Sequence, residues 1–447
     1  MMPNKKIVTI VGAGLAGSEC ALQLAKKGYK IHLIEARASE TDAPRITTPA
    51  HISNKCAELV CSNSFGSLMD YSAPGQLKWE AKKMGSFILK AAQETSVPAG
   101  MALSVDRKIF AETITEIIQN HPSIEIIEKE ITDLNDIPRP AVIATGPLTM
   151  SALSKSLMEH FDSKFLYFFD AIAPIIDADS INLDVAFLGD RYGKGTQDYL
   201  NCPLNKEQYD QLIHEINLAH KVEAKSFEQV DFENTPYFDG CMPIEEMVRR
   251  GPETLRHGPL SPKGLQQQGP EWRMHAVVQL RKENKEGTAY NMVGFQTKMA
   301  YGEQKRIFRM IPGLKDAEFL KLGSIHRNLF IHSPSQLTPF LASKKDPDLF
   351  FAGQITGVEG YFESTCIGLL VANFLDQKLS GYEMKAPDRK TAMGSLLNAI
   401  TDSERENFQP TNINFSLFPL PEEGNFRGRR NKIKKREEII RIAKELS

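Results

Sequence analysis

The feature that most limits what this chain can fold into is a glycine-rich segment close to its start. Five apolar or β-branched residues, Ile7 to Val11, predict a buried strand, and Gly12, Gly14 and Gly17 follow in G-x-G-x-x-G spacing. This spacing allows a tight turn, a close approach of the backbone to a pyrophosphate, and close packing of the next helix on the strand. A helical pattern from Ser18 to Lys27 then presents its N-terminal N–H groups to the phosphates.

A second predicted strand, Lys30 to Ile34, ends in an acid that fits the same fold. Glu35 lies about 20 residues past the glycines, where a carboxylate accepts a ribose hydroxyl. The glycine fingerprint alone is weak evidence, but here strand, helix and acid lie within one unit of about 30 residues. The segment therefore predicts dinucleotide binding, and the alternative is a glycine-rich turn in another α/β protein. The residues expected to bind the cofactor are Gly12, Ala13, Gly14, Leu15, Ala16, Gly17 and Glu35.

A second glycine-rich turn lies near the other end of the chain. Leu349 to Ala352 predicts a strand, and Gly353, Gly357 and Gly360 follow it, before a helix expected from about Glu363 to Leu375. The N–H groups of such a turn would lie near a flavin and its pyrophosphate. Flavoproteins often have an aspartate where this chain has Gln354. The residues expected to bind the cofactor here are Gly353, Gln354, Gly357 and Tyr361.

The two turns predict an α/β protein with one Rossmann-like FAD-binding domain built from both chain ends. We assign residues 1–195 and 326–447 to this domain and residues 196–325, which are rich in charges and prolines, to an inserted α/β domain. Part of residues 85–130 could belong to the inserted domain instead.

Shorter patterns predict the elements between the turns. Helices are expected from Gly75 to Ala92, which is amphipathic, and from Asp106 to Gln119. Strands are expected from Ile124 to Ile131 and in Ala141-Val-Ile-Ala-Thr-Gly146, whose Thr-Gly ending suits the last strand of a nucleotide-binding sheet.

Composition is that of a soluble globular protein. The 447 residues are 41% hydrophobic and 25% charged, with a net charge of −2 that gives no overall attraction to nucleic acid. No run of about 18 apolar residues occurs, so no membrane partner is expected. The first predicted strand begins within six residues of Met1, which leaves no room for a signal peptide. We therefore expect a cytoplasmic protein.

Six cysteines are scattered along the chain and form no C-x-x-C pair, so no metal site is expected. Cys61 precedes Ser62, Asn63 and Ser64, which are good helix caps, and a helix start there would favour its thiolate. A buried packing cysteine is an equally good interpretation of Cys61. Cys241 lies between a glycine and a nearby proline, which favours an exposed, reactive thiol on a turn.

Several longer motifs resemble the bacterial folate- and FAD-dependent tRNA (uracil-5-)-methyltransferases, relatives of the GidA-type tRNA-modifying flavoproteins. The similarity runs almost end to end, and its most specific segments are Ala57-Glu-Leu-Val-Cys-Ser-Asn-Ser64 and Gly240-Cys-Met-Pro-Ile-Glu245. The chain departs from the family in having Gly66 in place of an arginine, a longer loop at 39–53 and a more basic C-terminal tail.

The resemblance implies methylation of C5 of an RNA uridine, most often the T-loop uridine of tRNA. It implies 5,10-methylenetetrahydrofolate as the carbon donor, FADH2 as the reductant and NAD(P)H as the source of electrons. Uracil C5 becomes nucleophilic once a thiolate adds to C6, and a base must later remove the C5 proton. The resemblance assigns the addition to Cys241, the proton removal to Cys61 and a structural role to Cys202.

Cations that could contact RNA phosphates fall in two places, near Cys241 and in the basic tail, although a basic run is more often a solvated helix face. They are Arg249, Arg250, Arg256, Arg429, Arg430, Lys434 and Lys435. Three other functions stay open on the sequence: the same reaction on a 23S rRNA uridine, an NAD(P)H–flavin oxidoreductase acting on a small molecule, and a non-catalytic RNA-binding protein that retains FAD.

Overall fold

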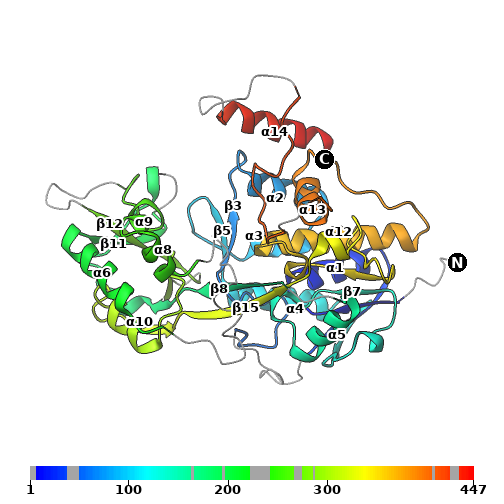
Figure 1. Ribbon diagram of the computed structural model, residues 1–447, viewed down its shortest axis with the longest axis horizontal. Coiled ribbons are helices and arrows are strands. Elements are labelled where there is room, and N and C mark those ends of the chain that lie inside the picture. The colour runs from blue at the N-terminus through cyan, green and yellow to red at the C-terminus, as the bar shows by residue number, and fades with distance from the viewer. Residues whose placement is uncertain are drawn as a thin grey trace.

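The computed structural model describes residues 7–37, 50–162, 166–193, 197–221, 242–265, 274–284, 287–404, 408–422 and 432–447. Figure 1 shows that they form two lobes. The larger lobe, on the right, contains both ends of the described chain, and the smaller lobe, on the left, contains its middle. An antiparallel pair of strands, β8 (Leu166–Ile172) and β15 (Ser324–Phe330), runs between the lobes.

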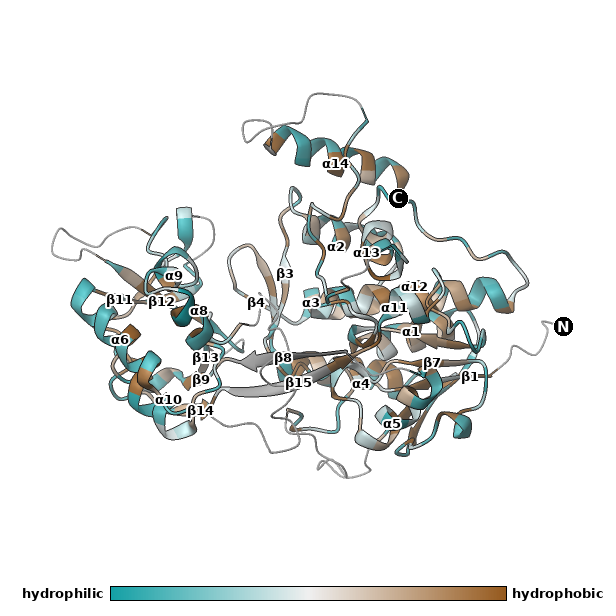
Figure 2. Ribbon diagram, viewed as in Figure 1, coloured by the Kyte–Doolittle hydropathy of each residue, from teal (hydrophilic) through white to brown (hydrophobic). Residues whose placement is uncertain are grey.

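A five-stranded parallel sheet lies in the larger lobe. Its strand order is β16-β7-β1-β2-β6. The strands are β1 (Ile7–Val11), β2 (Lys30–Glu35), β6 (Ile124–Glu128), β7 (Ala141–Ile143) and β16 (Leu349–Phe351). Figure 2 shows the hydrophobic β1 and β7 within this lobe. Because β16 comes from the far end of the sequence, both chain ends build one sheet, as the two glycine turns predict.

Helices α1 (Leu15–Lys26) and α12 (Tyr361–Leu379) follow the two glycine turns and pack against each other. A Cβ atom on Gly368 would lie 2.3 Å from the carbonyl oxygen of Ala16, so a larger residue would push the helices apart. The other helices of this lobe are α2 (Ala73–Lys83), α3 (Phe87–Glu94), α4 (Arg107–Gln119), α5 (Ser151–Phe161), α11 (Ser333–Gln336), α13 (Ala392–Thr401) and α14 (Lys432–Leu446).

The single helix predicted from Gly75 to Ala92 is wrong, because the structure has α2 and α3 in its place. Gly85 separates them in a left-handed conformation, with φ of +75°. Ser86 then caps α3 by accepting a hydrogen bond from the N–H of Leu89. The prediction for α4 is confirmed, and Asp106 caps it. A small sheet of β3 (Ser64–Ser67), β4 (Ser96–Val97) and β5 (Ala102–Val105) lies beside these helices.

The smaller lobe is built on a second sheet, with strand order β10-β11-β12-β13-β9-β14. Its strands are β9 (Ile175–Asp177), β10 (Phe187–Leu188), β11 (Tyr199–Leu204), β12 (Ala276–Lys282), β13 (Ala289–Met292) and β14 (Phe319–Lys321). Its helices are α6 (Lys206–Leu218), α8 (Ile244–Arg250), α9 (Thr254–His257) and α10 (Tyr301–Phe308).

Each lobe has its own hydrophobic core among the described residues. The core of the smaller lobe begins at Ile176, which is earlier than the boundary at 196 suggested by the sequence. Side chains of segment 85–130, including Phe110 and Ile114, belong to the core of the larger lobe. We therefore propose that the insert extends from about β9 to β14. No helix in the described part of the chain combines the length and the apolar content needed to span a membrane.

Candidate active site

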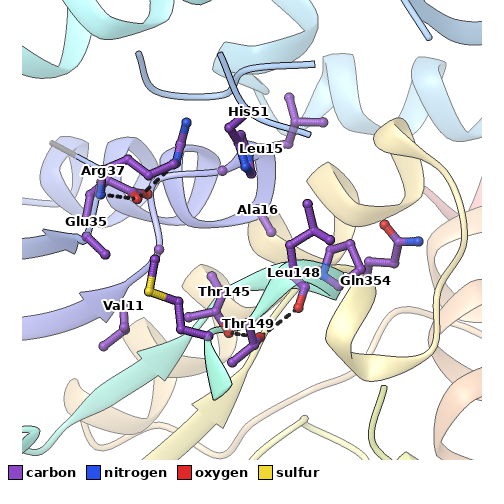
Figure 3. A pocket seen from close by; sticks show the side chains of 18 of the residues that line it. Val11, Leu15, Ala16, Glu35, Arg37, His51, Thr145, Leu148, Thr149 and Gln354 are labelled. Carbon is purple, nitrogen blue, oxygen red and sulfur yellow. Dashed lines mark hydrogen bonds and ion pairs between the residues drawn. The ribbon is translucent and has the colours of Figure 1, made fainter. Parts of the chain in front are cut away.

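A cleft opens where the carboxyl ends of the parallel strands meet, the place where α/β sheets bind nucleotides. It holds about 1080 Å³ of empty space, including its open mouth. Figure 3 shows Glu35 and Arg37 on one side of the cleft and Thr145, Thr149 and Gln354 on the other. Of the predicted cofactor residues, those that line it are Gly12, Gly14, Leu15, Ala16, Glu35, Gly353, Gln354 and Tyr361. Ala13, Gly17 and Gly357 are not part of its wall.

The first glycine turn has the shape that a bound pyrophosphate needs. Gly12 has φ of +101°, and a Cβ atom on it would lie 2.6 Å from the carbonyl oxygen of Ala144. A Cβ atom on Gly17 would lie 1.9 Å from the carbonyl oxygen of Gly12. Gly14 differs, because nothing lies within 4 Å of the position its Cβ would take. It precedes α1, which has no side-chain cap and no acid in its first turn. The turn therefore fits the phosphates of a dinucleotide.

Glu35 is fixed at the rim of the cleft by the turn itself. Its Oε2 accepts a hydrogen bond of 2.8 Å from the N–H of Ala13. Ala13 therefore does not line the cleft itself but orients Glu35, which does. Its Oε1 accepts from the backbone N–H of Arg37 at 3.0 Å. A carboxylate has about four lone-pair sites, so Glu35 can still accept a ribose hydroxyl.

Arg37 was not singled out by the sequence analysis. Its Nε lies 3.2 Å from Glu35 and its Nη1 lies 3.0 Å from Glu58. Both carboxylates come from segments that border the cleft, so Arg37 ties the end of β2 to the segment around Glu58. In the sequence, Arg37 is marked only by being a cation two residues after Glu35, the acid expected to bind the ribose. Such a position is not specific enough to predict this role.

The second glycine turn packs on the first. Gly353 has φ of +83°, and a Cβ atom on it would lie 2.8 Å from the Cβ of Ala16. Gly357 has φ of +87° and faces the ring of Phe408, which would lie 2.3 Å from an added Cβ. Gly357 therefore shapes the turn and does not line the cleft. Thr145 and Thr149, whose hydroxyls lie 2.6 Å apart, complete the wall after β7.

Cys61 lies next to the cleft, held by a tyrosine. The hydroxyl oxygen of Tyr361 accepts hydrogen bonds from the N–H groups of Cys61, at 2.6 Å, and Ser62, at 3.1 Å. The helix expected to begin after Cys61 is absent: Ser64–Ser67 forms β3. The predicted effect of a helix dipole on this thiol is therefore wrong.

Two further side chains tie the Cys61 segment to the smaller lobe. Arg107 on α4 donates to the carbonyl oxygens of Leu59 (3.2 Å) and Cys61 (3.0 Å), and its Nε lies 2.7 Å from Oε2 of Glu283. Asn63 donates from Nδ2 to the carbonyl oxygen of Lys282 at 3.0 Å. We call Tyr361, Arg107, Asn63 and Glu283 the Cys61 clamp. Burial would lower the pKa of Arg107, but Glu283, Tyr361 and Cys61 together outweigh this effect and the pKa is raised.

Cys61 is the one part-exposed cysteine in the described residues, and the other described cysteines are buried. Burial raises the pKa of the Cys202 thiol to about 12, which suits a packing role. Burial also raises the pKa of Cys20, Cys56 and Cys366. Cys241 lies outside the described residues, immediately before the segment that leads into α8. Within the described ranges, no group of three or more His, Cys, Asp or Glu residues is arranged for a metal ion.

The candidate RNA-binding cations lie on both lobes. Arg249 and Arg250 end α8, and Arg256 lies on α9 with its Nη1 2.9 Å from Glu253. Lys434 and Lys435 lie in the first turn of α14, while Arg429 and Arg430 lie outside the described residues. Figure 1 places α14 above α2 on the larger lobe and α8 and α9 on the smaller lobe, so the described cations of the two sets come from helices on different lobes.

Comparisons with known proteins agree with one another over most of the chain. Residues 7–383 match the family model of glucose inhibited division protein A. A Bdellovibrio bacteriovorus protein named methylenetetrahydrofolate--tRNA-(uracil-5-)-methyltransferase TrmFO is 62% identical over 442 residues, which cover 99% of this chain and 97% of that protein. A protein of the same name from Persephonella marina is 49% identical over 434 residues, or 97% of both chains.

A solved structure supports the fold. GidA of Aquifex aeolicus aligns with a TM-score of 0.66 at 16% identity, over 100% of this chain and 74% of that one. The family-model match and the full-length sequence matches show that the chain belongs to the TrmFO branch of the glucose inhibited division protein A family.

Proposed function

We propose that this protein methylates C5 of the T-loop uridine of tRNA, with 5,10-methylenetetrahydrofolate as carbon donor, FAD as cofactor and NAD(P)H as electron source. The observation that carries the proposal is the 62% identity, over 99% of the chain, to a protein named for this reaction. The names of the relatives specify tRNA, so the rRNA alternative has no support from them. A flavin oxidoreductase for small molecules would have no use for the tRNA and folate in those names.

The residues of the cleft fit FAD. Gly14 and the N-terminus of α1 would hold the pyrophosphate, and Glu35 would accept the ribose hydroxyls. Gly353, Gln354 and Tyr361 would lie on the side of the ring system, where the second turn meets the first. When bound and reduced by NAD(P)H, FAD would supply the electrons that convert the transferred methylene group to methyl.

In this proposal the chain contributes two thiols. The thiolate of Cys241 adds to C6 of the uracil, and the electrons of the C5–C6 double bond move through C4 onto O4. C5 can then form its bond to the donor carbon. Cys61 takes the C5 proton, and the bond between the donor carbon and the folate nitrogen breaks, which releases tetrahydrofolate and leaves a methylene group on C5. As this methylene group is reduced to methyl, the Cys241 sulfur leaves C6 and the C5–C6 double bond forms again. The clamp supports the role of Cys61, since it holds both backbone groups of that residue beside the cleft.

Two variants test the assignment of the thiols. Cys241→Ala should form no covalent adduct with RNA that contains 5-fluorouridine. Cys61→Ala should keep the adduct and lose methyl transfer. Cys202→Ala, a buried thiol of the smaller lobe, is the control that should keep both if the protein retains FAD. An adduct formed by Cys241→Ala would overturn the role given to that thiol.

A further inference from the structure

The loop between β10 and β11 presents an exposed tyrosine in a strained backbone conformation. Tyr192 has φ of +60°, in the left-handed region that a bulky residue rarely adopts. The residue is 69% exposed, so the strain does not serve to bury its ring in a core. Strained residues persist only where their surroundings fix them, and they gather at ligand-binding sites. Tyr192 is thus a candidate ligand-binding residue.

A neighbouring segment of the smaller lobe fixes Tyr192. The N–H of Tyr192 donates to the carbonyl oxygen of Gly264 at 2.6 Å. A Cβ atom on Gly264 would lie 2.8 Å from the tyrosine ring, so the absence of a side chain there leaves room for the ring. Arg191 joins the two segments, because its Nη1 donates to the carbonyl oxygens of Ser261 and Lys263. The ring is therefore held in place before a ligand binds, which lowers the entropy cost of binding.

The ring of Tyr192 has room for a flat partner. It rests on Gly264, and a Cβ atom on the adjacent Gly193 would meet nothing within 4 Å. Most of the surface of Tyr192 is therefore available for stacking. Exposed aromatic rings on which bases stack are a common means by which proteins hold unpaired nucleotides.

Positive charge lies beside this ring. Lys263 is exposed one residue before Gly264, and the guanidinium of Arg191 interacts electrostatically with Tyr192. The segment that carries Lys263 follows α9, whose last turn holds Arg256. An aromatic ring next to cations suits a single-stranded nucleic acid, because the ring stacks on a base while the cations contact phosphates. It suits a protein partner less well, since the centre of a protein interface is depleted of charges.

The loop that carries Tyr192 also contacts the larger lobe. Asp198, near the other end of the loop, accepts a hydrogen bond of 2.6 Å from the N–H of Gly100, in the turn between β4 and β5. The hydroxyl of Tyr199 donates to the carbonyl oxygen of Ala99 in the same turn, at 3.3 Å. An RNA held at Tyr192 would therefore lie at the edge of the smaller lobe that meets the larger one. This position suits an RNA whose target base must leave its stack to reach the cleft.

We propose that Tyr192 stacks on an unpaired base of the tRNA substrate and that Lys263 contacts a neighbouring phosphate. The inference rests on the proposed function for the identity of the RNA. Tyr192 binds and orients, and no bond is made or broken at its ring. Because the left-handed backbone serves to present the ring, a glycine at this position should relieve the strain and remove the stacking surface.

Binding of a fluorescently labelled, unmodified tRNA transcript to the full-length, FAD-loaded protein tests the site. Tyr192→Gly should weaken binding roughly fivefold or more, the usual effect of losing one stacked base. Its melting temperature should equal that of the wild type or exceed it, since glycine adopts this conformation without strain. Tyr192→Phe keeps a ring that can stack and should bind within about twofold of wild type.

A matched control lies on the same lobe. Tyr301 is 60% exposed and begins α10, which Figure 1 places at the bottom of the smaller lobe while α9 lies at the top. Tyr301→Ala should leave tRNA affinity unchanged. In Tyr192→Trp the fluorescence of the new indole should be quenched when tRNA is added, because a stacked base quenches it, and in Tyr301→Trp it should not.

The salt dependence of binding separates the two contacts. Lys263→Gln should reduce the slope of log affinity against log salt concentration by about one, as expected for one lost phosphate contact. Tyr192→Gly should lower the affinity and leave this slope unchanged, because stacking releases no counterions.

Any of three results would overturn the proposal. Unchanged tRNA affinity in Tyr192→Gly would show that the ring does not bind RNA. An equal loss in Tyr192→Phe would assign the contact to the hydroxyl instead of the ring. A fall in the melting temperature of Tyr192→Gly that accompanies its loss of affinity would indicate a structural role.

The proposed function is tested separately, because none of these measurements requires turnover. Wild-type protein that binds tRNA through Tyr192 but transfers no methyl group would contradict the proposed function and leave this site intact.

Discussion

The ion pair between Arg107 and Glu283 links the smaller lobe to the Cys61 segment, and Glu283→Gln tests that link. Removing one partner of a buried pair costs about 3–5 kcal/mol, whereas an exposed pair is worth about 0–1 kcal/mol. Here the Arg107 side chain is 19% exposed and that of Glu283 is 6% exposed. Because glutamine keeps one acceptor oxygen, we expect an intermediate loss of about 1–2 kcal/mol.

That loss should act on the position of the smaller lobe against Cys61. If the whole loss destabilises the arrangement in which the smaller lobe is docked against the Cys61 segment, the fraction of molecules in that arrangement falls by a factor of up to about 5 to 30. The single-turnover rate of methyl transfer, measured at saturating tRNA and folate, should fall by a similar factor while FAD is retained. Arg107→Lys should behave alike, because lysine lacks the fork that reaches Leu59, Cys61 and Glu283 together.

A matched control is available on the same lobe. Glu303 pairs at 2.7 Å with Arg306, whose side chain is 47% exposed, so Glu303→Gln should change the rate less than twofold. A double-mutant cycle with Arg107→Gln and Glu283→Gln should give a coupling energy of about 1 kcal/mol or more. Wild-type rates in Glu283→Gln together with zero coupling would refute the link.

Four further variants test separate parts of the site and of its support. Tyr361→Phe removes the acceptor for the N–H groups of Cys61 and Ser62 while keeping the ring. The rate of methyl transfer should fall about tenfold or more without loss of FAD. Unchanged turnover would argue against a positioning role for Tyr361. Gly12→Ala should destabilise the protein itself, because the added Cβ would meet Ala144. Gly14→Ala should fold normally and weaken only FAD binding, since its added Cβ would meet nothing but the cleft. Equal melting temperatures for the two apoproteins would contradict this distinction. Lys78→Met tests a buried lysine whose pKa is lowered by burial to about 8. Between about pH 8 and the pKa of lysine in the unfolded chain, near 10.5, the unfolded chain binds more protons than the folded one. The free energy of unfolding of the wild type should therefore rise with pH by about 2–4 kcal/mol relative to the variant. Parallel stability curves for the two proteins in denaturant titrations from pH 7 to 10.5 would rule out this effect of Lys78.

The cofactor cleft could be predicted from the sequence because its main parts are local. Gly12, Gly14 and Glu35 lie within one strand–helix–strand unit whose spacing follows from the geometry of phosphate and ribose binding. The second turn, at Gly353, carries a similar local pattern. That these two turns pack together is the one long-range inference, and β16 beside β7 in the sheet agrees with it.

The Cys61 clamp could not be predicted in this way. Arg107 and Glu283 are separated by 176 residues, and neither stands in a pattern that indicates its partner. Local reasoning was also misled at Cys61, because Ser62, Asn63 and Ser64 suit a helix start as well as they suit the turn before β3. There Asn63 bonds to the other lobe instead of capping a helix.

The most direct test of the proposed function is the fate of a labelled carbon. FAD-loaded protein would be given NAD(P)H, 5,10-methylenetetrahydrofolate labelled in its methylene group, and unmodified tRNA and rRNA in one reaction, followed by mass spectrometry of the digested RNA. We predict labelled 5-methyluridine at the T-loop position of tRNA and nowhere in rRNA. Label found only in rRNA, or in no nucleoside while the flavin is reduced and reoxidised, would contradict the proposed function.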